Sequence, residues 1–169
     1  TTLAMLRGAT LGAGFEAALS CDVIVAERGI KVGFPEVLFN MFPGMGAMSF
    51  LSRRIPPSLA ERMITTGKLY SAEELQELGL IDYLVDAGKA GERLPALLRA
   101  LRKSRGTRVA LARARARVSA ISLEELEDIS DIWVDTALQL PESDLVKVER
   151  LLLAQNQKSN QQRGARSTH

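Results

Sequence analysis

Two glutamates near the start of the chain each follow a turn-forming element, and together they could carry out acid–base chemistry. Glu16 closes a short run that begins at Gly12, and Glu36 comes directly after Pro35. A tight turn that opens a helix leaves backbone N–H groups without helical partners. A carboxylate in that first turn places a proton-transfer group beside these donors. Chemistry next to a thioester carbonyl needs both, because negative charge develops on the oxygen while a proton moves.

Each glutamate also has a purely structural interpretation. A carboxylate in the first turn of a helix interacts favourably with the helix dipole by roughly 0.3–1 kcal/mol, so either residue alone is better explained as structural. The glycines of 12–17 also fit the Gly-x-Gly-x-x-Ala pattern of a dinucleotide-binding turn. We reject that interpretation because the helix after the turn is predicted to be only about two turns long. In addition, Glu36 lies beyond the next strand instead of at its end.

The elements that must position these residues are predicted to be mixed α/β up to about residue 86. Apolar patterning predicts strands and helices in this order: strand 2–6, helix 15–20, strands 23–26 and 31–34, helix 47–52, strand 80–85. The pattern Ser-x-x-Glu, a capping box, predicts helices that start at Ser58, Ser71 and Ser122. Gly79 is predicted to end the second of these helices.

From about residue 90 onward the chain is predicted to be helical. The helix that starts at Ser122 carries one apolar stripe and is predicted to stop at Pro141. A last amphipathic helix is predicted to follow, through Leu145, Val148 and Leu152. The stripe consists of Leu126, Ile129, Trp133, Ala137 and Leu140. We therefore expect a core over 1–105, a helical oligomerisation region over 106–160 and a disordered tail over 161–169.

Composition excludes several classes of function. The chain of 169 residues is 46% apolar and 25% charged with net charge +2, which is typical of a soluble globular domain and gives no electrostatic case for nucleic acid. His169 is the only histidine and Cys21 the only cysteine, so neither a Ser-His or Cys-His pair nor a zinc site is expected. Cys21 is predicted to be a buried small hydrophobe. We expect no metal and no cofactor.

The same composition predicts a cytoplasmic protein. One cysteine cannot form an intrachain disulfide, which fits a reducing compartment. No apolar run approaches the roughly 20 residues that cross a bilayer, and the first residues lack the pattern of a signal peptide. We therefore predict no membrane insertion.

A basic stretch runs from Arg99 to Arg117 without an acidic residue. Its simplest interpretation is a solvated helix face. The functional alternative is a docking surface for an anionic partner, such as an acyl carrier protein, a coenzyme A phosphate or, less readily, nucleic acid. No aromatic residue interrupts the stretch, which argues against base stacking.

Four runs, 7–22, 33–38, 42–46 and 78–82, resemble the crotonase (enoyl-CoA hydratase/isomerase) superfamily. The resemblance implies an α/β fold, a partial ββα spiral followed by a C-terminal helical region. Within the superfamily, the runs 15–21, 36–40 and 132–140 are most similar to the bacterial diffusible-signal-factor synthases, and the likeness extends to about residue 158.

This resemblance implies specific roles for the site residues. Glu16 and Glu36 would share the acid–base steps, and which of them is acid and which is base stays open. The Ala13 N–H, supported by Gly14 at the helix start, would bind the thioester oxygen, with alanine where the family has glycine. The implied reaction dehydrates a 3-hydroxyacyl carrier protein to a cis-2-enoyl thioester and hydrolyses it to a free fatty acid, a quorum-sensing signal. A homo-oligomer and a regulatory signalling protein are the other expected partners.

An apolar tunnel for the acyl chain is also expected, although most of its candidate residues are equally explained as ordinary core. The candidates for substrate binding are Gly12, Val37, Leu38, Phe39, Met41, Phe42, Met45, Met48 and Trp133.

Two other functions remain open. One is a hydratase or isomerase that acts on acyl-CoA, and the other is a non-catalytic remnant that only binds a partner. The resemblance places a second oxyanion amide and several strands before residue 1, so we expect these 169 residues alone to show little thioester chemistry.

Overall fold

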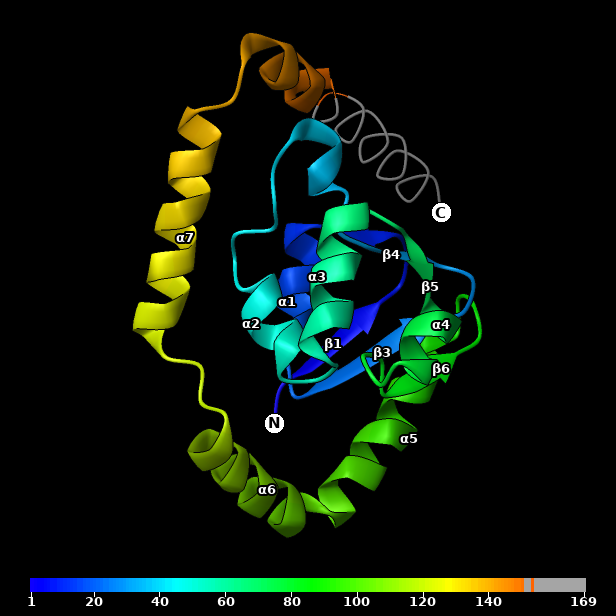
Figure 1. Cartoon of the computed structure of the whole chain (residues 1–169). Helices are drawn as coiled ribbons and strands as arrows, with labels where there is room; N and C mark the ends of the chain where they lie inside the picture. Colours follow the sequence, from blue (N-terminus) through cyan, green and yellow to red (C-terminus); the bar gives the residue numbers. More distant parts are fainter. Residues whose placement is uncertain (151–152, 154–169) are drawn as a thin grey trace.

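Two small sheets organise the first part of the chain in the computed structural model, which describes residues 1–150 and 153 (Figure 1). The first sheet is parallel and has the order β1 (Leu3–Leu6), β3 (Val23–Glu27), β6 (Tyr83–Val85). The second has the order β2 (Thr10–Leu11), β4 (Lys31–Gly33), β5 (Tyr70–Ser71). In it, β2 runs parallel and β5 antiparallel to β4.

Short helices cover these sheets and enclose the core. They are α1 (Ala13–Leu19), the 3-10 helix η1 (Glu36–Phe39), α2 (Ala47–Ser52), α3 (Pro57–Thr66) and α4 (Ala72–Glu77). The strand β3 is buried along its whole length, as its β-branched run predicts. Phe15 and Phe34 stack at the centre of the core with ring centroids 5.1 Å apart. This contact fixes α1 against the end of β4, and the two glutamate-bearing segments begin there.

The last part of the chain forms a helical arc around the core (Figure 1). It consists of α5 (Ala90–Lys103), α6 (Arg105–Val118) and α7 (Leu123–Leu138), followed by helical residues 142–150. Leu101 and Leu97 of α5 pack against Val23 and Val25, which ties the first helix of the arc to the parallel sheet. No described helix is long and apolar enough to cross a membrane.

Arg53 anchors the middle of the arc, at the junction of α6 and α7, to the core. Its guanidinium donates to both carboxylate oxygens of Glu125, at 2.9 and 2.7 Å. It also donates to the carbonyls of Ser119 and Ala120. Bidentate Arg–carboxylate pairs give geometric specificity as well as energy, so this residue sets where α7 begins relative to α2.

The mixed α/β fold and the helical C-terminal region confirm the predicted fold class. At Ser71 both bonds of the predicted capping box form. At Ser122 the hydroxyl accepts the Glu125 N–H at 3.0 Å, whereas the Glu125 carboxylate turns to Arg53. Gly79 has the expected left-handed conformation after α4, with φ +76°.

Some predicted boundaries were wrong. α3 begins at Pro57 with Pro56 as its N-cap, not at Ser58, because proline at the first helical position presets the helical φ. The strand predicted over 80–85 is shortened to β6, and the preceding Leu80 and Ile81 are buried in a turn. Four residues of the predicted stripe lie on α7, but the helix ends at Leu138, so that Leu140 lies outside it and Pro141 follows three residues after its end.

Other predictions are only partly right, concern residues outside the described range, or are not tested by the structure. Cys21 is half-buried instead of buried. Leu152 and residues 161–169 lie outside the described residues. The division at residue 105 coincides with the start of α6 and stays a prediction.

Candidate active site

Pairing between β2 and β4 brings the two glutamate-bearing segments together. Leu11 lies opposite Gly33 in the parallel register, and the Gly12 N–H donates to the Gly33 carbonyl at 3.0 Å. Gly12 has φ +53° and ψ −128°, a conformation that a residue with a Cβ rarely adopts. Glu16 follows on α1, and Glu36 follows β4 as the first residue of η1. The strand pair therefore fixes both acids at one end of the second sheet.

Glu16 is a buried carboxylate held by two backbone amides. Its side chain is 2% exposed, and its Oε1 accepts the N–H groups of Met45 at 2.7 Å and Ala47 at 3.0 Å. Burial raises the pKa of Glu16 above its ordinary value of 4.5, and the amides of Ala47 and Met45 oppose that rise. The Phe42–Gly46 turn thus positions this acid.

Glu36 is held differently. Its Oε2 is buried and has no hydrogen-bond partner in the described part of the chain. Burial raises the pKa of Glu36 from 4.5 to about 7, its own backbone N–H opposes the rise, and the charge of Glu16 adds to it. A buried polar oxygen without a partner is costly, which makes Glu36 a candidate for a group that exchanges protons with a ligand.

Both glutamates line one cavity of about 370 Å³. Of the residues predicted from the sequence, Ala13, Met45 and Trp133 join them there. The amides of Ala13 and Gly14 belong to the first turn of α1, where helical N–H groups have no carbonyl partner within the helix. The cavity therefore combines two carboxyl groups, a helix start and an apolar wall.

Four further residues line the cavity that sequence reasoning did not identify: Pro43, Gly44, Ser130 and Val134. Gly44 faces Trp133 so closely that a Cβ there would overlap the indole ring. The hydroxyl of Ser130 lies 3.3 Å from the Gly44 carbonyl and 2.8 Å from that of Leu126. The Pro43-Gly44 turn next to Met45 could have indicated Gly44 as a lining residue. The contribution of Ser130 and Val134 depends on where α7 packs against the core, which the sequence does not indicate.

The structure does not bring the other tunnel candidates to this cavity. Phe42 and Met48 line a separate apolar cavity of about 250 Å³ between α2, α3 and α7. Val37 and Phe39 are half-buried on η1, and Met41 is buried. Leu38 points outward and is 66% exposed. For Val37, Leu38 and Phe39 the short 3-10 helix explains why they do not reach the cavity together, since its tight turn directs successive side chains to different sides.

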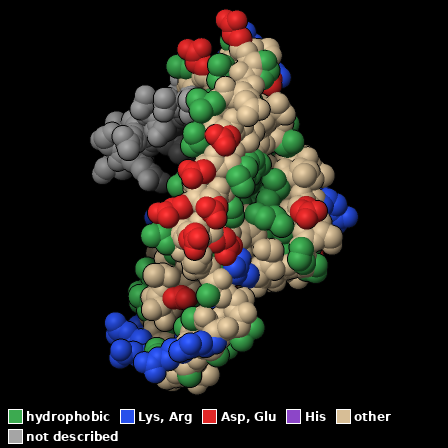
Figure 2. Space-filling model, turned by 60° about the vertical axis from the view of Figure 1, so that its left-hand side comes forward, with side chains coloured by type: hydrophobic (Ala, Val, Ile, Leu, Met, Phe, Trp, Pro, Cys, Tyr) green, Lys and Arg blue, Asp and Glu red, His purple; other side chains and the backbone are tan. Residues whose placement is uncertain are grey.

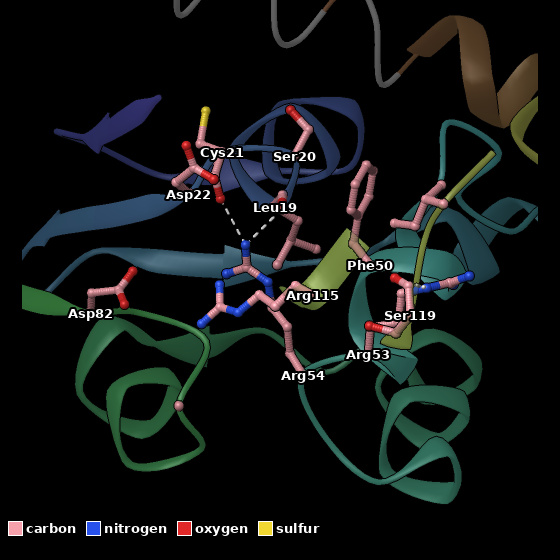
Figure 3. Close-up of a pocket in the computed structure, with 12 residues that line it drawn as sticks. Leu19, Ser20, Cys21, Asp22, Phe50, Arg53, Arg54, Asp82, Arg115 and Ser119 are labelled. Carbon is pink, nitrogen blue, oxygen red and sulfur yellow. Dashed lines mark hydrogen bonds between the residues drawn. The ribbon is translucent and has the colours of Figure 1, made fainter. Parts of the chain in front are cut away.

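A second cavity, of about 390 Å³, lies at the other end of α1 and contains neither glutamate (Figure 3). There Arg54 donates to the carbonyls of Leu19 at 2.9 Å and Cys21 at 2.7 Å. Cationic donors near the end of a helix satisfy its last carbonyls. Arg54 thereby fixes the helix that presents Glu16. Desolvation lowers the pKa of Arg54. The charge of Asp82 opposes this lowering, and the charge of Arg115 adds to it.

No group of three or more metal-ligating side chains lies together among the described residues. The chemistry that this arrangement can perform is proton transfer by two carboxyl groups in unequal environments, beside N–H donors that can hold a developing negative charge.

Fold and site together define a mixed α/β protein with a paired-glutamate cavity closed by a C-terminal helix. The profile of the enoyl-CoA hydratase/isomerase family matches residues 1–135. The chain therefore belongs to this family, within the crotonase superfamily, and the observed fold is the partial crotonase fold that the sequence predicted.

Individual relatives agree with the assignment. The chain is 39% identical over 79 residues to the 2,3-dehydroadipyl-CoA hydratase of Escherichia coli K12, covering 47% of this chain and 31% of that protein. It is 43% identical over 84 residues to the enoyl-CoA isomerase/hydratase fer4 of Mycosarcoma maydis, a match that covers 49% of this chain and 31% of that protein. Enoyl-CoA hydratase subunit I of Geobacillus kaustophilus HTA426 matches in structure with TM-score 0.61 and 28% identity, over 88% of this chain and 58% of that chain. These matches span between about a third and just over half of each relative.

Proposed function

We propose that the glutamate cavity performs acid–base chemistry on an acyl-CoA thioester, adding water to a 2-enoyl chain or removing it from a 3-hydroxyacyl chain. The supporting observation is the contrast between two carboxyl groups in one cavity. Two amides hold Glu16, whereas Glu36 has a buried, unpartnered oxygen and a pKa of about 7. A group that titrates near neutral pH can both accept and donate a proton during a catalytic cycle.

The contrast suggests how the steps are divided. Glu16, whose ionised form two N–H donors favour, takes a proton from water as the water oxygen bonds to C3. The electrons of the C2–C3 double bond move toward the thioester oxygen, and the Ala13 N–H stabilises the charge there. Glu36, in its protonated form, then donates a proton to C2. Dehydration follows the same steps in reverse, and isomerisation would need only proton transfer between carbons of the chain.

The comparisons support acyl-CoA as the substrate class, because the relatives named above are described as acting on CoA thioesters. A second candidate is the release of a cis-2-unsaturated fatty acid from a 3-hydroxyacyl carrier protein, by dehydration and thioester hydrolysis. The position of Trp133 favours it, because this residue belongs to the helix that resembles the signal synthases and lines the glutamate cavity. A regulatory partner would belong to this second candidate.

The experiment measures hydration of a trans-2-enoyl-CoA by loss of the conjugated thioester absorbance. It compares the 169-residue chain, from which we expect little turnover, with any longer polypeptide that contains it, in which the effect of each substitution on turnover is measured. Glu16→Gln and Glu36→Gln should each reduce turnover by about 10²–10⁴-fold. Binding of the acyl-CoA, followed by fluorescence of Trp133, the only tryptophan, should be retained in both variants. Met48→Leu, in the separate apolar cavity, is the matched control.

Mass spectrometry of the products distinguishes the two candidates. A 3-hydroxyacyl-CoA formed from the enoyl-CoA supports the first, and a free cis-2-unsaturated acid formed from 3-hydroxyacyl carrier protein supports the second. If both glutamine variants keep full turnover, the assignment of the site is wrong.

A further inference from the structure

Ser130 lines the glutamate cavity from the face of α7 that packs against the turn between η1 and α2. Leu126, Ser130 and Trp133 are four and three residues apart, which places them on one side of the helix. Leu126 and Trp133 lie so close to Gly46 and Gly44 that a Cβ at either glycine would crowd them. The two glycines therefore allow α7 to approach the turn, and this approach brings the Ser130 hydroxyl to the backbone of the turn.

The Ser130 hydroxyl reaches two carbonyl groups with a single proton. It lies 2.8 Å from the Leu126 carbonyl, which is the bond to the residue four positions back that a serine inside a helix commonly makes. It also lies 3.3 Å from the Gly44 carbonyl, which belongs to a different element. The proton is therefore divided between two acceptors, and the longer bond to Gly44 is the weaker of the two.

The Gly44 carbonyl belongs to the same peptide group as the Met45 N–H. That N–H donates to Oε1 of Glu16 at 2.7 Å. A hydrogen bond accepted by the carbonyl of a peptide group strengthens the bond that its N–H donates, because both polarise the group in the same direction. The Ser130 hydroxyl, the Gly44–Met45 peptide group and Glu16 thus form a chain of hydrogen bonds that ends on a buried carboxylate.

We propose that Ser130 is a positioning residue for Glu16, and that its hydroxyl supports the ionised form of this acid through the Gly44–Met45 peptide group. When Glu16 is ionised, the Met45 N–H donates more strongly, and the Gly44 carbonyl becomes a better acceptor. The Ser130 proton then moves from the Leu126 carbonyl toward that of Gly44. This role rests on the proposed function, in which ionised Glu16 takes a proton from water, and it gives α7 a part in setting the charge of that acid.

The charged groups around Glu16 are few, so a change in its titration can be traced. The elements that pack most closely on α1 are α2, β1 and β2, and none of these three contains a titratable side chain. Glu36 is the other charged residue that lines the cavity, whereas Arg54 lies at the opposite end of α1. Figure 2 shows the acidic side chains of α7 in a row along its exposed side. Glu125, which is half-buried, is held by Arg53.

The test follows the carboxyl group of Glu16 directly, by carbon-13 NMR titration of the 169-residue chain without substrate. The signal is identified by its absence from Glu16→Gln, and the Glu36 carboxyl is followed in the same spectra. Ser130→Ala removes the hydroxyl, whereas Ser130→Thr retains one. Thr136→Ala is the matched control, because the Thr136 hydroxyl makes the same kind of bond on the same helix, to the Ile132 carbonyl at 2.8 Å.

In Ser130→Ala the proton affinity of the Glu16 carboxylate should rise about 1.5- to 4-fold, because a charge-assisted hydrogen bond loses part of its strength. Ser130→Thr and Thr136→Ala should titrate as the native chain does. A hydroxyl that only stabilised the fold would change urea unfolding and leave the titration unchanged. A native titration in Ser130→Ala, or an equal rise in Ser130→Thr or Thr136→Ala, would overturn the proposal.

Kinetics of a longer polypeptide that hydrates a trans-2-enoyl-CoA separate this inference from the proposed function. The acidic limb of the pH profile of kcat/KM reports the base of the free enzyme, so Ser130→Ala should move this limb to higher pH by the same factor. If the Glu16 carboxyl titration moves and the acidic limb does not, Glu16 is not the base of the reaction. That result would reject the proposed function, and the support of Glu16 by Ser130 would stand.

Discussion

Replacing Glu36 by glutamine should make the protein more stable at high pH and leave its stability nearly unchanged at low pH. The reason is the buried, unpartnered carboxyl oxygen, which the folded protein tolerates best when the group is protonated. Glutamine has nearly the same shape and remains neutral at every pH. The substitution therefore removes the electrostatic cost of ionising this group and retains most of its packing.

The magnitude follows from the pKa. Burial raises the pKa of Glu36 from 4.5 to about 7, and at about 1.4 kcal/mol for each tenfold change in proton affinity this corresponds to about 3 kcal/mol. Between these two values the folded state holds a proton that the unfolded state has released. Since stability falls with pH wherever the folded state binds more protons, the native chain should lose stability from pH 4.5 to 7 and little beyond.

The assay is urea unfolding of the native chain and of Glu36→Gln at about pH 4.5 and 8. The stability difference between the two proteins should grow by about 3 kcal/mol in favour of the variant as pH rises. Any constant cost of burying an amide cancels in this comparison. Glu77→Gln, at an exposed position on α4, is the control and should show no such growth. A difference that is the same at both pH values would refute the reasoning.

Three further substitutions test the parts that hold the site. Gly12→Ala should destabilise the chain by about 1–2 kcal/mol, because φ is left-handed and the new Cβ would meet the Glu36 carboxylate. Urea unfolding measures this, with Gly8→Ala, whose Cβ has open space, as control. Gly44→Ala should displace Trp133 and change its fluorescence, whereas Gly91→Ala should not. Arg53→Lys should loosen α7, because lysine cannot reproduce the bidentate bond to Glu125, and hydrogen exchange in α7 should increase.

The sequence predicts the elements best where local chemistry decides them. The β-branched run at Val23 becomes a buried strand, Ser71 forms its capping box, and α2 spans 47–52 as expected. Predictions fail where a neighbour in space competes with the local pattern. Glu125 cannot complete its capping box because Arg53, 72 residues away in sequence, takes its carboxylate.

In the candidate site too, local patterns predict some features, and contacts between segments distant in the sequence decide the others. Glycine and proline signals predict that Glu16 and Glu36 follow tight turns, but their convergence depends on the pairing of Leu11 with Gly33. The wall formed by Ser130 and Val134 depends on the return of α7 to the core, which no local pattern specifies. The tunnel candidates on η1 fail to reach the cavity because a 3-10 turn disperses side chains that a sequence pattern groups together.

The feature that most clearly departs from ordinary packing in this chain coincides with the place where we propose function. The buried oxygen of Glu36, which has no partner among the described residues, lowers the stability of the chain. Burial elsewhere, as in the stacked Phe15 and Phe34, offsets this cost. A ligand that donates a hydrogen bond to the buried carboxyl oxygen of Glu36 would relieve this cost. Binding and stability should therefore be coupled, and a ligand that engages Glu36 should stabilise the native chain more at pH 8 than it stabilises Glu36→Gln.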